Sequence, residues 1–180
     1  MNRLVAALLV AGAVVLQVAV VNRLPLPWGV PPDVVVLVLT AVALGTTPVT
    51  GALSGFAAGL AVDVLPPADH ELGRYALLLS VAGYAVGSLR QSRNRGAAWP
   101  FIVAAGTVFG VALGWVLISV LVGDPRATLS SAVVTVALTT GTTMLVSPLV
   151  LLPALKLRNH FTTDDVLNVA VSPRVGGIRG

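Results

Sequence analysis

The chain has 180 residues, of which 56% are hydrophobic and 10% are charged, and its formal net charge is +4 at pH 7. An ordinary soluble domain carries roughly 25% charged residues, so this composition excludes a soluble globular protein and predicts an integral membrane protein. The absence of cysteine excludes disulfides, thiolate metal sites and cysteine nucleophiles. We interpret the basic residues as topology signals of a membrane protein and not as a nucleic-acid interface.

Apolar segments separated by short breaks rich in proline, glycine or charge follow one another along the chain. The first has the shape of a signal peptide, but no small-residue cleavage site follows it before Asn22, so we expect a retained helix. A helix needs roughly 20 mainly apolar residues to cross about 30 Å of hydrocarbon. We predict membrane helices over 4–21, 34–46, 48–65, 74–89, 99–122 and 127–155.

The second segment, 34–46, raises an alternative, because a helix of this length rises only about 20 Å and could be re-entrant. The predicted fold class is therefore all-α, a polytopic integral membrane helical bundle with six, or alternatively five, transmembrane helices. We assign residues 1–155 to this membrane domain. Residues 156–180 are polar with several glycines, which predicts a loosely ordered cytoplasmic tail.

The distribution of Lys and Arg predicts the orientation, because cytoplasmic loops carry an excess of them. With six spans, most of the 11 basic residues fall on the side of both termini and of the loop 90–96. We therefore expect that side to be cytoplasmic and the loop 66–73 to face outside. Five spans would change the side of the N-terminus only.

Glycines recur every four residues in the third segment, at Gly51, Gly55 and Gly59, and Asp63 is the next member of the series. Small residues at this spacing let helix backbones approach closely in lipid. The spacing recurs in two later segments, at Gly83, Gly87, Gly106, Gly110 and Gly114. We expect these glycines to pack helices inside one monomer, and a subunit interface, including a homodimer, is the alternative.

The sixth segment is rich in hydroxyl side chains, namely Thr135, Thr139, Thr140, Thr142, Thr143 and Ser147. Such hydroxyls commonly bond back to carbonyls of their own helix, which makes them tolerable in a membrane. A polar lining for a small ligand is the alternative.

Catalytic constellations are missing from the sequence. Ser54 precedes a glycine, but Ala52 stands where the rhomboid pattern GxSG requires glycine, and His70 and His160 fall on opposite sides of the predicted bundle. Asp63 has no second membrane carboxylate, as an aspartyl protease would need. Two lone histidines make no metal site. We therefore predict no enzyme, no cofactor and no bound metal.

Asp63 calls for a partner, since a carboxylate at the C-terminal end of a helix is disfavoured by roughly 0.3–1 kcal/mol. Pro66 and Pro67 end the helix, and Arg74 is the nearest cation along the chain. We predict that Asp63 and Arg74 pair and hold the third and fourth segments in register, with the loop 66–73 facing a partner. A solvated carboxylate in the headgroup region is the alternative.

Four short motifs form an ordered series: Pro32-Asp33, then Gly55-x3-Gly59-Leu60 with Asp63, then Leu72-Gly73 with Ala76-Leu77, then Gly83-Tyr84-x2-Gly87-x-Leu89. In order, in spacing and in the layout of residues 1–155, the chain resembles the rod shape-determining protein MreD family. Together with the glycine spacing, the resemblance marks a set of structural or partner-facing residues: Asp33, Gly51, Gly55, Gly59, Asp63, Gly73, Arg74, Gly83, Tyr84 and Gly87.

The resemblance implies a non-enzymatic scaffold subunit of the peptidoglycan elongation complex in the bacterial cytoplasmic membrane. Family members bind the bitopic protein MreC and, through it, MreB, RodA and a class B penicillin-binding protein. The resemblance also implies a fold similar to the membrane subunits of energy-coupling-factor vitamin transporters. The alternative function is therefore a transporter subunit that binds a small, vitamin-like molecule.

Overall fold

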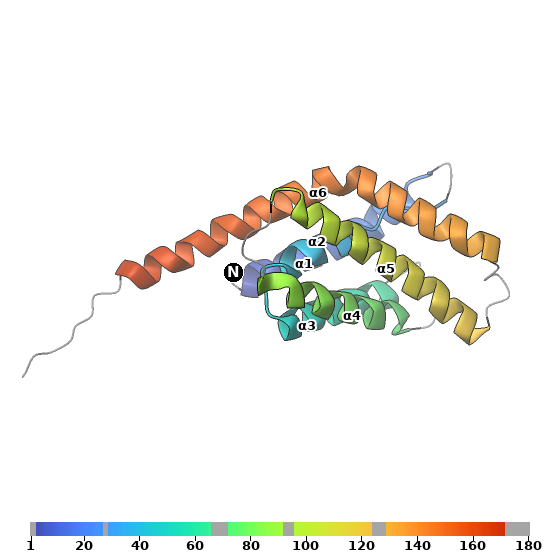
Figure 1. Cartoon of the computed structure of the whole chain (residues 1–180), viewed down its shortest axis with the longest axis horizontal. Helices are drawn as coiled ribbons and strands as arrows, with labels where there is room; N and C mark the ends of the chain where they lie inside the picture. The colour runs from blue at the N-terminus through green and yellow to red at the C-terminus, as the bar shows by residue number, and fades with distance from the viewer. Residues whose placement is uncertain (1–2, 27–28, 66–71, 92–95, 124–128, 172–180) are drawn as a thin grey trace, which may run out of the picture.

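The computed structural model describes residues 3–26, 29–65, 72–91, 96–123 and 129–171, and all regular structure in them is helical. Two short 3₁₀ turns, Val21–Arg23 and Leu89–Gln91, follow the first and fourth helices. The α-helices are α1 (Arg3–Ala19), α2 (Val34–Ala43), α3 (Pro48–Val64), α4 (Arg74–Ser88), α5 (Trp99–Val122) and α6 (Leu129–Val171). They form one elongated bundle (Figure 1). The predicted all-α class is confirmed, and the six predicted segments each match one helix.

The sixth helix is longer than its predicted segment. α6 passes through Pro148 and Pro153 without ending and continues to Val171, well beyond position 155. The border between the membrane domain 1–155 and the tail 156–180 is therefore not marked by the end of a helix. The loose order of the tail stays a prediction.

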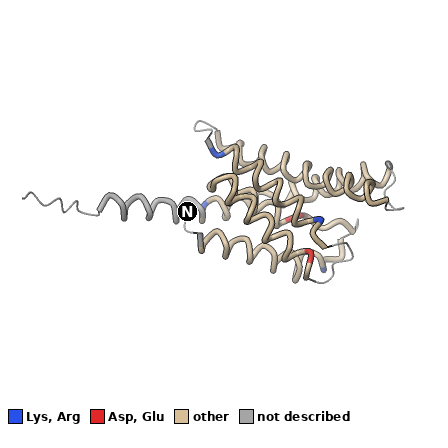
Figure 2. The backbone as a smooth tube through the Cα atoms, turned by 90° about the horizontal axis from the view of Figure 1, so that it is seen from below, with Lys and Arg blue, Asp and Glu red and all other residues tan. Residues whose placement is uncertain are grey.

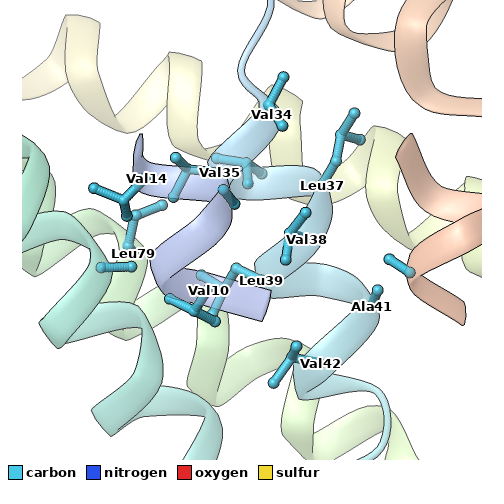
Figure 3. Packing of buried hydrophobic residues seen from close by; sticks show 14 of the residues in the cluster. Val10, Val14, Val34, Val35, Leu37, Val38, Leu39, Ala41, Val42 and Leu79 are labelled. Carbon is cyan, nitrogen blue, oxygen red and sulfur yellow. The ribbon is translucent and has the colours of Figure 1, made fainter. Parts of the chain in front are cut away.

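α2 forms the centre of the bundle, and all ten of its residues are buried. Valines and leucines on every side of α2 pack against α1, where Val10 and Val14 contribute, and against Leu79 of α4 (Figure 3). A helix that is hydrophobic all round is expected in such a buried position. Its one polar side chain, Thr40, donates to the carbonyl of Val36 at 2.8 Å, so no polar group of α2's side chains is left unpaired in the core.

The two ends of α2 lie at opposite ends of the bundle. Asp33, just before α2, contacts Tyr75 in the first turn of α4, whereas Ala43 clusters with Val86 and Val103 near the end of α4 and the start of α5. We call the end that holds Asp33 the distal end. α2 thus connects the two ends of the core, and the choice between six and five spans stays a prediction. The start of α1 and the far part of α6 lie at the end opposite the distal end (Figure 1).

Three helical stretches in the described part of the chain are long and apolar enough to cross a membrane: Leu4–Arg23, Trp99–Val122 and Ser130–Leu157. α2 and α3 are shorter apolar helices. Figure 2 shows acidic positions toward the distal end, while most of the tube is uncharged. α2 rises only about 15 Å, which is shorter than the hydrocarbon core. The non-helical backbone just before α2 must therefore form its hydrogen bonds with other parts of the protein.

Candidate functional site

α3 and α4 meet at backbone distance along their glycines. A Cβ atom added at Gly51 or Gly55 would overlap the backbone carbonyl of Gly83 or of Leu79, and one at Gly59 would lie 2.6 Å from the nitrogen of Ala76. No side chain fits in these positions without separating the two helices. The three glycines of α3 therefore pack it against α4 within one chain.

The glycines of α4 complete the same contact from the other side. A Cβ at Gly83 would overlap the carbonyl of Gly51, and one at Gly87 would lie 2.8 Å from the Cα of Pro48. Tyr84, between them, is 55% exposed on the outer surface of α4. The partner-facing role predicted for these residues stays a prediction.

α5 differs from this pair of helices. Gly106 and Gly110 are exposed, and a Cβ at either would meet nothing within 4 Å. A Cβ at Gly114 would overlap the end of the flexible Leu78 side chain, which would have to move aside. The expectation that the glycines of this helix pack inside the monomer is therefore wrong for Gly106 and Gly110, because the neighbouring helices do not approach there.

Asp63 joins the distal end of α3 to the start of α4. It is only 2% exposed, and its carboxylate accepts hydrogen bonds from the backbone nitrogens of Gly73 and Ala76, both at 3.0 Å, and of Tyr75, at 3.3 Å. The first amides of a helix have no partner within it, and the positive end of its dipole favours an anion. Gly73 adopts a φ of +95°, which glycine accommodates without strain.

Arg74 turns toward α5. Its Nη2 donates to Ser119 Oγ at 2.7 Å, and its guanidinium lies 4.7 Å from the ring centroid of Trp115, a geometry in which the ring face attracts the cation. The pairing of Asp63 with Arg74 stays a prediction. Within the loop 66–73, residues 66–71 lie outside the described part of the chain.

Asp33 caps α2 and links it to two other helices. Its carboxylate accepts from the nitrogen of Val36 at 3.0 Å and from the hydroxyl of Tyr75. Its own backbone nitrogen donates to Thr143 Oγ1 of α6 at 2.9 Å. An aspartate before the first turn is a favourable N-cap, and here the same side chain also ties α2 to α4.

Gln17 of α1 supplies the remaining hydrogen bonds before α2. Its Oε1 accepts from the nitrogen of Val34 at 2.8 Å, while Nε2 donates to the carbonyl of Pro32 at 3.1 Å and to Asn22 Oδ1 at 2.7 Å. These contacts satisfy backbone groups that would otherwise be buried without partners, which costs about 1–3 kcal/mol for each group. Gln17 therefore supplies hydrogen-bond partners for the buried backbone that leads into α2.

Thr143 belongs to the hydroxyl-rich series of the sixth segment, although its contact with Asp33 was not predicted. Four other residues of this network are not among those that the sequence patterns indicated, namely Gln17, Tyr75, Trp115 and Ser119. Gln17 did carry a signal, since it is the only polar residue in the segment 4–21. The others carried none, because nothing local indicates which neighbour they contact. Among the described residues, no group of three or more His, Asp or Glu side chains could hold a metal ion.

The geometry of the distal end is thus a hydrogen-bond network that connects all six helices. In comparisons with known proteins, the family of the rod shape-determining protein MreD matches residues 1–161. No curated protein and no solved structure matches the chain, so the similarity in fold to energy-coupling-factor subunits stays a prediction. The match covers the ordered motifs and all but the last part of α6, and the chain therefore belongs to the MreD family of bacterial membrane proteins, which has a role in determining rod shape.

Proposed function

We propose that the protein is a non-enzymatic membrane scaffold subunit of the peptidoglycan elongation complex, and that it supports cell shape by binding MreC. The observation that carries the proposal is the family match over residues 1–161, since the family is one of shape-determining membrane proteins and not a known enzyme family. Through MreC the subunit is connected to MreB, RodA and a class B penicillin-binding protein. The contacts of Asp33 and Asp63 support a structural role, because both carboxylates are used to join helices.

The groove between α4 and α5 is the face that we propose for MreC. It encloses about 580 Å³ and is lined almost entirely by apolar side chains, together with Gly106 and Gly110. The glycines of α3 and α4 are packed against the backbone of the other helix, whereas Gly106 and Gly110 have open space beside them. Small residues four apart admit a second helix at close range. The single transmembrane helix of a bitopic partner fits such a groove.

The test is affinity purification of the tagged, full-length protein from its own membranes, with quantitative mass spectrometry of MreC. Two variants are compared, Gly110→Leu in the groove and Gly12→Leu on α1, where a Cβ also meets nothing within 4 Å. We expect MreC with the wild type and with Gly12→Leu. For Gly110→Leu, recovery should fall about tenfold, which corresponds to about 1.4 kcal/mol of binding free energy, with no change in the thermal unfolding of the purified protein.

The outcomes separate the two parts of the proposal. Full recovery of MreC with Gly110→Leu would reject the α4–α5 groove as the contact face and leave the scaffold role standing. Failure of the wild type to recover MreC would reject the scaffold role itself. ATPase subunits recovered in place of MreC would support the alternative of a transporter subunit.

A further inference from the structure

A pocket of about 410 Å³ opens at the distal end. It is lined by residues of α1, α3, α4, α5 and α6, of the 3₁₀ turn after α1 and of the non-helical segment before α2. Its polar and aromatic lining comprises Gln17, Asn22, Tyr75, Trp115, Thr135 and Thr139, and the remaining lining residues are valines, an alanine and a proline. Small-molecule sites have volumes of about 300–1,000 Å³ and combine an apolar wall with a few placed polar groups. Asn22 is exposed, so the pocket can be reached from outside the bundle.

The two threonines of α6 that line the pocket, Thr135 and Thr139, differ from Thr142 of the same helix in what their hydroxyls do. Thr142 donates back to the carbonyl of Leu138 at 2.8 Å, and Thr107 of α5 does the same to Val103 at 2.7 Å. Within the described part of the chain, neither Thr135 nor Thr139 shows such a bond. Back-bonding is the usual way in which a membrane helix satisfies threonine, so these two hydroxyls remain available to a molecule in the pocket.

The two amide side chains of the lining, Gln17 and Asn22, are joined by a hydrogen bond. Gln17 is bound on both sides to the backbone before α2, and it donates to Asn22 Oδ1 at 2.7 Å. This contact orients the Asn22 amide and leaves its NH₂ group to donate elsewhere. The pocket thus offers hydroxyls from α6 and an amide donor next to α1, which can pair with carbonyl, amide or hydroxyl groups of a ligand.

The charge of the lining limits the ligand further. Among the described residues, no Asp, Glu, Lys or Arg side chain lines the pocket. Arg74 lies over Trp115 and donates to Ser119, and the hydroxyl of Tyr75 is directed to Asp33. An ionised ligand would lose its hydration without gaining a counter-ion in the wall, which is costly. The edge-to-face rings of Tyr75 and Trp115, with centroids 6.2 Å apart, offer a flat apolar contact instead.

We propose that the distal pocket is a binding site for a small, uncharged organic molecule with a flat ring or apolar body and hydrogen-bonding groups at one edge. The grooves between α4 and α5 and between α5 and α6 have walls of almost only apolar side chains and lack this set of polar groups. The proposal does not depend on the binding of MreC, because the distal pocket shares a single lining residue, Val111, with the α4–α5 groove.

The test is equilibrium dialysis of the full-length protein in lipid nanodiscs, with protein-free nanodiscs as the baseline for partition into lipid. The probes are 1-naphthamide and 1-naphthoate, which share a ring system and differ in charge. We expect saturable one-to-one binding of 1-naphthamide. Binding of 1-naphthoate should be at least about tenfold weaker, because the charged group loses its hydration in a wall without a counter-ion.

Three variants report on the site itself. Thr139→Val keeps the shape and removes the hydroxyl, and should weaken 1-naphthamide binding about tenfold, as expected when a buried partner is left unsatisfied. Thr142→Val, on the same helix but outside the pocket lining, should bind as the wild type does. Thr135→Phe fills the pocket and should abolish binding.

Absence of saturable binding to the wild type would overturn the proposal, and so would equal affinity for the two probes. Retention of wild-type affinity by Thr139→Val would also overturn it. This conservative variant carries the test if Thr135→Phe does not fold.

Discussion

Asp63 shows how a carboxylate can be stable in an apolar helix. Its position in the last turn of α3 is unfavourable by itself, because the carbonyl end of a helix dipole repels an anion. The structure compensates by placing the carboxylate at the start of α4, where it accepts from three backbone amides. Asp63 is thus unfavourable at the C-terminal end of α3 and favourable as a cap for the N-terminal end of α4.

Replacing Asp63 with Asn tests this compensation. The Asn side chain has one acceptor oxygen and brings an NH₂ group against amide donors, so at least one of the three bonds is lost. We expect Asp63→Asn to lower the free energy of unfolding by about 1–3 kcal/mol, measured by thermal unfolding in detergent. Ser88→Ala, an exposed hydroxyl that bonds only back to Tyr84, serves as the control. Equal stability of Asp63→Asn and wild type would contradict the capping role.

Among the helices, glycines spaced four residues apart have two different structural roles in this chain. On α3 and α4 the glycines face each other, and a methyl group would meet backbone atoms that cannot move aside. On α5, Gly106 and Gly110 face the open groove. The same pattern in the sequence therefore produces a closed helix pair in one place and an unfilled surface in the other.

Two alanine substitutions, one in the closed helix pair and one in the open groove, test these two roles. Gly55→Ala places a methyl group against the carbonyl of Leu79 and forces α3 and α4 apart, so we expect a loss of about 1–3 kcal/mol of stability, as for other overpacked cores. Gly110→Ala should cause no loss, because its Cβ has open space and alanine favours the helix over glycine. The measurement is the temperature at which each variant leaves the monodisperse peak in size-exclusion chromatography. Equal effects of the two substitutions would contradict the distinction.

At the scale of the molecule, six passes along the bundle put the start of α1 and the far part of α6 at one end (Figure 1). The excess of Lys and Arg predicts that this end is cytoplasmic. The distal end, with the pocket and the cap of α4, would then face outside. The proposed sites for MreC and for a small molecule lie on different parts of this one bundle.

Single cysteines can test the orientation, because the natural chain has none. Leu24→Cys, Leu72→Cys and Gly96→Cys introduce thiols at exposed positions. We expect a membrane-impermeant maleimide to label the first two in intact spheroplasts and the third only after lysis, with the cysteine-free protein as the blank. Protection of Leu24→Cys in addition to Gly96→Cys, with Leu72→Cys still labelled, would favour five spans with the N-terminus outside. Labelling of Gly96→Cys in intact spheroplasts would reverse the orientation.

The class of the protein and the limits of nearly every helix could be predicted from the sequence. Long apolar runs interrupted by Pro, Gly and charge can form only helices in lipid, because every backbone group there needs a partner within its own segment. The order of motifs from Pro32-Asp33 to Leu89 also indicated the family, and the match over residues 1–161 confirmed it.

Which side chains contact one another depends on how the helices pack, and this could not be predicted from the sequence. Asp63 was expected to need a partner, but its bonds to the backbone of α4 depend on how two helices are joined. Gln17 and Thr143 lie far from Asp33 in the sequence and reach the start of α2 only because α2 occupies the centre of the bundle. Local patterns specify helices through backbone geometry, whereas contacts between helices depend on packing, which the periodicity of one segment does not contain.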